Sequence, residues 1–184
     1  MVRIALIYGL ISGLVIILGI LGTTVLAGDG HHGSVWLGYL IMLVALSAIL
    51  VGVKQHRDQA LGGVITFWAG FGLGLGIALI ASLAYVAVWE AYLAATHYTF
   101  MDKYTAEILA AKRAAGVTGA AYAKAVAEAD AMRRQYANPL LRMPETFMEI
   151  FPVGLLVALV SAALLRNARF LPARSRPTPA RGAS

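Results

Sequence analysis

Residues 64–98 decide the fold class of this chain and read VITFWAGFGLGLGIALIASLAYVAVWEAYLAATHY. One of these 35 residues, Glu90, is charged. An apolar run of this length exceeds the helices of soluble proteins and predicts a helix that crosses a membrane. Trp68 and Trp89 lie 21 residues apart, which corresponds to about 31 Å at the helical rise. Because Trp prefers the edges of a hydrocarbon core that is about 30 Å thick, we expect both indoles to mark the ends of this span.

The composition of the whole chain is that of an integral membrane protein. Apolar residues account for 60% of the 184 residues and charged residues for 13%, whereas a soluble domain has about 25% charged residues. Four apolar runs predict spans at about residues 4–27, 35–53, 64–90 and 147–165. A signal-peptide core has about 7–15 apolar residues, and the first run is longer, so we interpret it as a retained span. The sequence contains no Cys and therefore no disulfide.

Glycines recur at helical spacing in the first and third spans. Small residues four positions apart allow two membrane helices to approach closely. We expect the third span to contact the first through its glycine face, because only small residues permit this close approach. The predicted packing residues are Gly9, Gly13, Gly70, Gly72, Gly74 and Gly76.

Residues 99–138, between spans three and four, are rich in Ala and in charged residues. Thr99 and Asp102 fit the capping box that begins a helix, and a Gly-Val-Thr-Gly segment predicts a turn between two helices. Asp130 and Arg134 have the i,i+4 spacing of an ion pair on the second helix. A helical hairpin of this size is too small to hold a core alone. It must therefore dock on the bundle, on the bilayer surface, on a second copy or on a partner.

Prolines and charges divide the rest of the chain. Pro139 ends the second hairpin helix, and Pro144 is expected to open the last helix. Residues 167–184 are rich in Arg and Pro and lack apolar periodicity, which predicts a disordered basic tail. We therefore predict an all-α fold, an integral membrane four-helix bundle with an external amphipathic helical hairpin between spans three and four. Residues 1–166 form a single membrane domain.

The distribution of Lys and Arg predicts the orientation in the membrane. Eight of them, against the single acid Asp58, fall near the chain ends and in the loop between spans two and three. Residues 90–150 hold seven, balanced by seven acids. Positively charged loops stay in the cytoplasm, so we expect both termini to be cytoplasmic and the hairpin to be external. This distribution also explains the net charge of +6 without nucleic acid as a partner.

Four short motifs follow one another along the chain: YGLISG at 8–13, FMDKY at 100–104, YANP at 136–139 and EIFPVG at 149–154. Their order and spacing resemble a family of small bacterial membrane proteins, the domain-of-unknown-function family 4199. The resemblance covers about residues 4–166 and implies four spans with an external hairpin between the third and the fourth. It implies no activity and no functional residue. Because this sequence lacks the Pro at the start of the hairpin in similar proteins, we expect the third span to continue straight into Thr99.

Glu149 is the most notable ionisable residue of the spans. Counting back from Arg166 at the inner edge places Glu149 about 5 Å inside the outer edge of the fourth span. Pro152 lacks the N–H that would bond the carbonyl of Met148. A carboxylate beside this carbonyl is suited to bind a cation or to pass a proton. The alternative interpretation is an interfacial Glu that reaches headgroups or a neighbouring Lys or Arg.

Glu90 and His97 lie seven residues apart and would share a face near the outer end of the third helix. Together with Glu149 and the pair His31-His32, they could form an external set of His and carboxylate ligands suited to zinc or manganese. No tight ligand spacing supports such a site. We therefore predict solvated loop and interface residues, with neither a metal nor a cofactor.

No motif in the sequence points to an enzyme. No Ser lies in a G-x-S-x-G elbow, and the sequence contains neither a P-loop nor a dinucleotide fingerprint. Two functions remain open for a chain embedded in membrane lipids. One is a non-enzymatic accessory or assembly module of the bacterial inner membrane, whose helix faces and hairpin contact a second copy or a membrane-protein partner. The other is a small transport or lipid-handling protein in which Glu149 couples to a proton or a cation.

Overall fold

The computed structural model describes residues 1–26 and 35–173, which are helical over most of their length. The helices in these residues are α1 (Val2–Leu26), α2 (Val35–Leu46), α3 (Ala48–Ala60), α4 (Phe67–Ala95), α5 (Phe100–Ala114), α6 (Gly119–Ala137) and α7 (Pro139–Leu165). Four described segments are long and apolar enough to cross a membrane: Val2–Ile20, Trp36–Ala60, Phe67–Ala95 and Pro139–Leu165. The predicted all-α class and the four-span membrane architecture are therefore confirmed.

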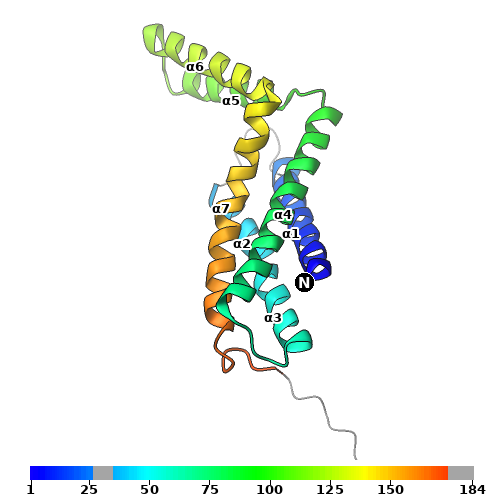
Figure 1. Ribbon diagram of the computed structural model, residues 1–184. Helices are drawn as coiled ribbons and strands as arrows, with labels where there is room; N and C mark the ends of the chain where they lie inside the picture. The colour runs from blue at the N-terminus through cyan, green and yellow to red at the C-terminus, as the bar shows by residue number, and fades with distance from the viewer. Residues whose placement is uncertain (27–34, 174–184) are drawn as a thin grey trace, which may run out of the picture.

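The spans form a bundle in which α4 has the most central position (Figure 1). α4 packs against α1, α3 and α7. α5 and α6 pack on each other and form the hairpin, which projects sideways from one end of the bundle and joins it at the start of α7. We call this end the hairpin end. The opposite end, where α1 begins and where α3 and α7 finish, is the terminal end.

Branched apolar side chains fill the interior of the bundle. Ile16 of α1, Ile49 of α3, Ile77 of α4 and Ile150 of α7 are fully buried and belong to one contiguous core. Large apolar side chains also face outward, among them Leu10, Leu14, Leu83 and Leu156. An apolar exterior around an apolar core is typical of helices that are surrounded by lipid.

Glycines of α1 allow its close contact with α4. A Cβ added at Gly13 would lie 2.8 Å from the carbonyl oxygen of Ala81, and one added at Gly9 would lie 2.6 Å from the Cβ of Ile80. Real Cβ atoms do not approach backbone oxygen this closely, so a larger residue at Gly13 would push the two helices apart.

The glycines of α4 face other neighbours. Added Cβ atoms at Gly70 and Gly74 would lie 3.5 and 3.0 Å from alanine side chains of α7. One at Gly76 would lie 3.7 Å from an alanine of α1, and one at Gly72 would meet no atom of the described residues within 4 Å. The expectation that the third span turns its glycine face to the first is therefore wrong for Gly70 and Gly74, because this part of α4 packs on α7.

Two helices extend beyond their predicted bounds. The second span continues past the single non-helical residue Ser47 into α3, so it ends at Ala60 rather than near residue 53. α7 begins at Pro139, where the Asn138 side chain caps the first turn. Proline suits the first helical position because the N–H that it lacks would have no partner there. Pro144 consequently lies inside α7 instead of opening it.

The chain turns sharply between α4 and α5. His97 and Tyr98 adopt positive φ angles of 52° and 56°, and the Tyr98 amide donates to a carbonyl of the last turn of α4 at 2.7 Å. The predicted straight continuation into Thr99 is therefore wrong. The Thr99 hydroxyl donates to the carbonyl of Thr96 at 2.9 Å, so the capping box expected with Asp102 is not formed.

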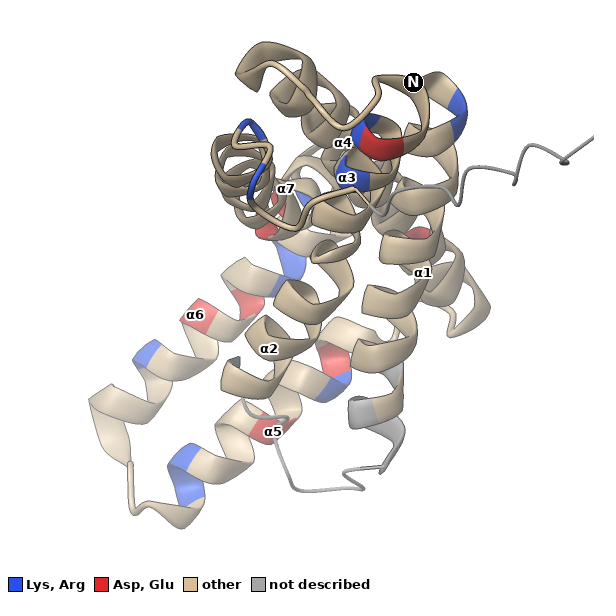
Figure 2. Cartoon of the chain, turned by 90° about the horizontal axis from the view of Figure 1, so that it is seen from below, with Lys and Arg blue, Asp and Glu red and all other residues tan. Residues whose placement is uncertain are grey.

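Charged residues are spread along the hairpin, and both signs occur on α5 and on α6 (Figure 2). The ion pair expected between Asp130 and Arg134 is replaced by one between Asp130 and Arg133, with 3.1 Å between Oδ1 and Nη1. Arg133 Nε also donates to the hydroxyl of Thr105 on α5 at 2.7 Å. Arg133 thus links the two hairpin helices, whereas the exposed Arg134 forms no such link.

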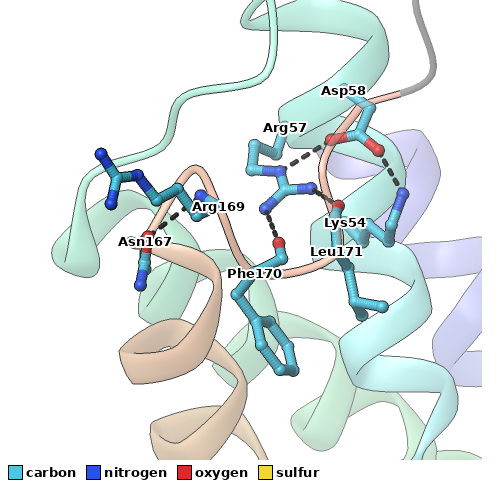
Figure 3. A network of polar contacts seen from close by, with 7 residues as sticks. All are labelled: Lys54, Arg57, Asp58, Asn167, Arg169, Phe170 and Leu171. Carbon is cyan, nitrogen blue, oxygen red and sulfur yellow. Dashed lines mark hydrogen bonds and ion pairs between the residues drawn. The ribbon is translucent and has the colours of Figure 1, made fainter.

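A polar network at the terminal end holds the residues that follow α7 (Figure 3). Arg57 is fully buried and donates to the carbonyls of Phe170, at 2.9 Å, and Leu171. Arg57 Nε also donates to Asp58 at 2.7 Å, and Lys54 bonds the other oxygen of the same carboxylate. Residues 170 and 171, within the segment expected to be disordered, are therefore tied to α3. The tail from residue 174 onward lies outside the described residues.

Candidate functional site

A buried ion pair joins the third and fourth spans at the hairpin end. Glu90 lies in the last turns of α4, and Arg142 lies in the first turns of α7, 52 residues later. Arg142 Nε donates to Glu90 Oε1 at 2.7 Å, and Nη2 donates to Oε2 at 2.6 Å. The planar guanidinium fork matches the two carboxylate oxygens. The Arg142 side chain is 4% exposed. Its buried charge is therefore stabilised by the Glu90 carboxylate rather than by water.

A backbone carbonyl and two aromatic rings enclose the Arg142 guanidinium. Its Nη1 donates to the carbonyl oxygen of Tyr136 at 2.8 Å. The ring centroids of Tyr98 and Tyr136 lie 5.3 and 5.5 Å from the Arg142 Cζ, within the range of cation–π attraction. Tyr98 belongs to the α4–α5 turn and Tyr136 to the end of α6. A single arginine of α7 thereby holds α4, the turn and α6 together.

Trp89 provides a second link between α4 and the hairpin. Its Nε1 donates to the Tyr136 hydroxyl at 2.7 Å, and its ring contacts Phe100 edge-on with 5.0 Å between centroids. Burial raises the pKa of the Tyr136 phenol, although the hydrogen bond from Trp89 acts in the opposite direction. Trp89 is 8% exposed because the hairpin covers the indole, so it does not face the lipid as the expected edge residue would. Trp68, at the other end of α4, is exposed.

An open pocket of about 800 Å³ lies at the base of the hairpin, and we call it the basal pocket. It is lined by the ends of α4 and α6, the α4–α5 turn and the starts of α5 and α7. Small-molecule sites have volumes of roughly 300–1,000 Å³. Its apolar wall includes Leu93, Met101 and Met143. Its ionisable residues other than tyrosine are Glu90, Asp102, Arg133, Arg134 and Arg142.

Two of the three arginines of the basal pocket are already paired. Arg142 is bound to Glu90, and Arg133 Nε lies 3.3 Å from Asp102 Oδ1. The Arg134 side chain is exposed and forms no hydrogen bond or ion pair within residues 1–26 and 35–173. Arg134 is therefore the cation of this pocket that a ligand can engage.

Glu149 lies two helical turns beyond Arg142 on α7 but is not paired with it. Its side chain lines a small pocket of about 280 Å³ together with residues of α2, among them Tyr39 and Met42. In the described part of the chain the Glu149 carboxylate has no hydrogen-bond or ion-pair partner. Pro152 follows inside the helix. The structure thus places an exposed carboxylate, without a partner among the described residues, beside a pocket between α2 and α7.

The grouping of Glu90, His97 and Glu149, which the residue types made conceivable but the sequence spacing did not support, is not assembled in the described residues. Glu90 is bound by its arginine partner, and α4 ends before His97, which lies in the turn with a positive φ angle. The seven-residue spacing therefore does not place His97 on the helical face of Glu90. The pair His31-His32 lies outside the described residues. Among the residues that are described, no three His, Asp or Glu side chains are grouped so that they could hold a metal ion.

Arg142 is the residue of this site that the sequence analysis did not identify. We expected the last span to begin near residue 147, so Arg142 was counted among the residues outside the membrane. The sequence does contain a signal for this ion pair, namely two opposite charges, one at the end of the third apolar run and one at the start of the fourth. Glu90 lies near the end of the third apolar run and Arg142 just before the fourth. Two antiparallel spans joined by a hairpin bring such charges to the same depth.

The comparison with family models matches residues 7–167 to the description "Protein of unknown function (DUF4199)". The comparisons with curated proteins and with solved structures found no match. The matched region contains the hairpin, the ion pair of Glu90 and Arg142, and most of the four spans. Because the match covers well over half of the chain, this membrane protein belongs to the DUF4199 family of proteins of unknown function.

Proposed function

We propose that this membrane protein is a non-enzymatic accessory or assembly module of the bacterial inner (cytoplasmic) membrane, which acts through its hairpin and its helix faces. The observation that carries the proposal is the attachment of the hairpin. Arg142, which is paired with Glu90, and Trp89 both bond Tyr136 at the end of α6 and so anchor the base of the hairpin, while both hairpin helices project away from the bundle (Figure 1). A surface that is held in place before binding loses less conformational freedom when a partner binds.

The faces of the hairpin are largely open. Within the hairpin, the buried residues are Thr105, Ala125 and Ala129, which lie where α5 and α6 meet. Tyr104 and Met132 are each 40% exposed, and aromatic residues and Met are enriched in protein interfaces. We therefore expect these side chains to belong to the contact surface. The proposed partner is a second copy of the chain or another membrane protein.

The charge distribution supports an orientation with both termini in the cytoplasm and the hairpin outside. Arg3, Arg166 and Arg169 are exposed near the terminal end, and positively charged segments next to spans stay in the cytoplasm. The hairpin instead carries acidic residues among its basic ones (Figure 2).

Site-specific crosslinking in the native membrane tests the accessory role. A photoreactive amino acid replaces Met132 on the hairpin, and the matched control replaces Leu61 at the terminal end, which is 43% exposed. We expect Met132 to give a discrete adduct and Leu61 to give none. Mass spectrometry identifies the adduct as a second copy or as another membrane protein. Equal adduct yields at the two positions, or no adduct at Met132, would contradict the proposal.

Glu149 supports a second candidate function, that of a small transport or lipid-handling protein. A carboxylate without a partner beside a pocket in a membrane helix is suited to bind a proton or a cation. Four spans form a narrow bundle, and its core is filled by apolar side chains. A transport path would therefore be expected between two copies. We place this function second because the anchored hairpin has no role in it.

A further inference from the structure

We propose that the basal pocket binds the phosphate-bearing, net negative headgroup of a membrane lipid, and that Arg134 receives this headgroup. The site is separate from the proposed protein contact. A protein partner would bind the exposed faces of the hairpin, whereas the lipid headgroup would bind at the base of the hairpin.

Segments that are distant in the sequence build the basal pocket. Leu93 from α4, Met101 from α5, Arg134 from α6 and Met143 from α7 all line it. Its position is fixed from its own wall, because Arg142 of α7 bonds α4 and α6 and Arg133 of α6 bonds α5. A pocket of about 800 Å³ has room for a lipid headgroup and the adjoining glycerol.

The charges of the wall favour an anion. Three arginines and two carboxylates line the pocket, so its formal charge is positive by one. The carboxylates of Glu90 and Asp102 are engaged by two of these arginines. Arg134 keeps its full set of guanidinium donors, within the described residues, for a ligand. A guanidinium binds a phosphate group through two parallel hydrogen bonds.

The apolar surroundings of the pocket indicate a lipid rather than a free phosphate ion. Leu140 and Leu141, in the first turn of α7, are 80% and 51% exposed, and Met143 in the pocket wall is also exposed. Clustered exposed apolar side chains at the start of a membrane helix are suited to contact acyl chains. Tyr98 in the same wall is a residue type enriched at the headgroup level. A headgroup bound in this pocket would therefore lie next to side chains that are suited to contact its acyl chains.

Native mass spectrometry of the full chain in mild detergent tests the proposal. Phosphatidylglycerol is the anionic probe, and phosphatidylcholine with the same acyl chains is the zwitterionic probe. We expect the native protein to prefer phosphatidylglycerol. Arg134→Gln should weaken phosphatidylglycerol binding about fivefold, because one basic residue near an anionic headgroup contributes about 1 kcal/mol. Phosphatidylcholine binding should not change, and Arg134→Lys should retain most of the preference.

Lys124→Gln is the matched control, since Lys124 is an exposed cation on the same helix and does not line the pocket. We expect its phosphatidylglycerol binding to equal that of the native protein. Inorganic phosphate, at the concentration used for the lipid, should not displace phosphatidylglycerol. Equal losses in Arg134→Gln and Lys124→Gln would overturn the site, as would a native protein without preference between the lipids. Displacement by inorganic phosphate would overturn the assignment to a lipid.

Discussion

Glu90 and Arg142 form a two-point ion pair that joins α4 to α7 where the hairpin leaves the bundle. The same guanidinium bonds the carbonyl of Tyr136 at the end of α6. A charge inside the span region therefore determines how the hairpin is attached. Buried charges are retained where they fix one arrangement among several, and we infer that this pair fixes the direction of the hairpin.

Removing one member of this pair should destabilise the protein strongly. We expect Glu90→Ala to cost about 3–5 kcal/mol, because it leaves the Arg142 charge buried without a partner. The measurement is the thermal midpoint in detergent. The double variant Glu90→Leu with Arg142→Leu should be more stable than Glu90→Ala, since no charge remains uncompensated. The exposed control Lys124→Ala should change stability by less than about 0.5 kcal/mol. A double variant less stable than Glu90→Ala would contradict the pairing.

The hydrogen bond from Trp89 should contribute measurably to the attachment of the hairpin. Trp89→Phe keeps an aromatic ring but removes the donor to Tyr136, and we expect a loss of about 0.5–1.5 kcal/mol. Adding Tyr136→Phe to this variant should cost little more, because the bond is already absent. Trp68→Phe is the control, since the Trp68 indole is 75% exposed. Similar losses for the Trp68 and Trp89 variants, measured by thermal unfolding, would argue against the bond.

The contact between α1 and α4 should tolerate no side chain at Gly13. Gly13→Ala should destabilise by about 1–3 kcal/mol, because the added methyl group would meet a backbone carbonyl that cannot turn away. Gly72→Ala is the control, since the described residues leave open space there. It should be neutral or slightly stabilising, as Ala favours the helix. Thermal unfolding of both variants in one detergent gives the comparison, and equal midpoints would count against the contact.

Glu149→Gln separates the two candidate functions. In the accessory role, the variant should complement a deletion strain as well as the native chain does. If Glu149 carries a proton or a cation, the variant should be expressed and assembled normally but fail to complement. Glu145→Gln is the control, because Glu145 is also exposed, one turn earlier on the same helix, but does not line the pocket of Glu149. Loss of complementation by Glu149→Gln alone would favour the transport function.

Reporter fusions should reveal the orientation of the chain. A reporter at residue 117, in the hairpin turn, is expected outside the membrane, because more Lys and Arg lie near the chain ends and in the loop between spans two and three. Reporters at residues 58 and 184 are expected in the cytoplasm, next to the excess of Arg and Lys. A cytoplasmic signal from residue 117 would contradict the proposed orientation.

The four spans and the hairpin could be predicted from the sequence because their signals are local. Each span is a continuous apolar run, and the backbone of such a run must satisfy its own hydrogen bonds in lipid, which leaves the helix as the form available to a single segment. The hairpin follows from a change in composition and from a glycine-containing turn. Helix ends were less accurate at Pro144 and Thr99, because capping depends on a few atoms whose geometry a pattern does not specify.

The rotation of each helix about its axis was decided by the tertiary structure. The sequence spacing places Gly70 and Gly74 on one packing face of α4. That this face contacts α7 rather than α1 follows from the arrangement of the helices in the bundle. Likewise, Trp89 fits the pattern of an interfacial residue, but the hairpin folds over it. The partner of Glu90 lies 52 residues away. Apolar composition determines that a segment spans the membrane. A single ion pair instead requires that two spans are in contact, that both residues lie at the same depth, and that both helices are rotated so that the side chains meet, and only the folded bundle meets these conditions together.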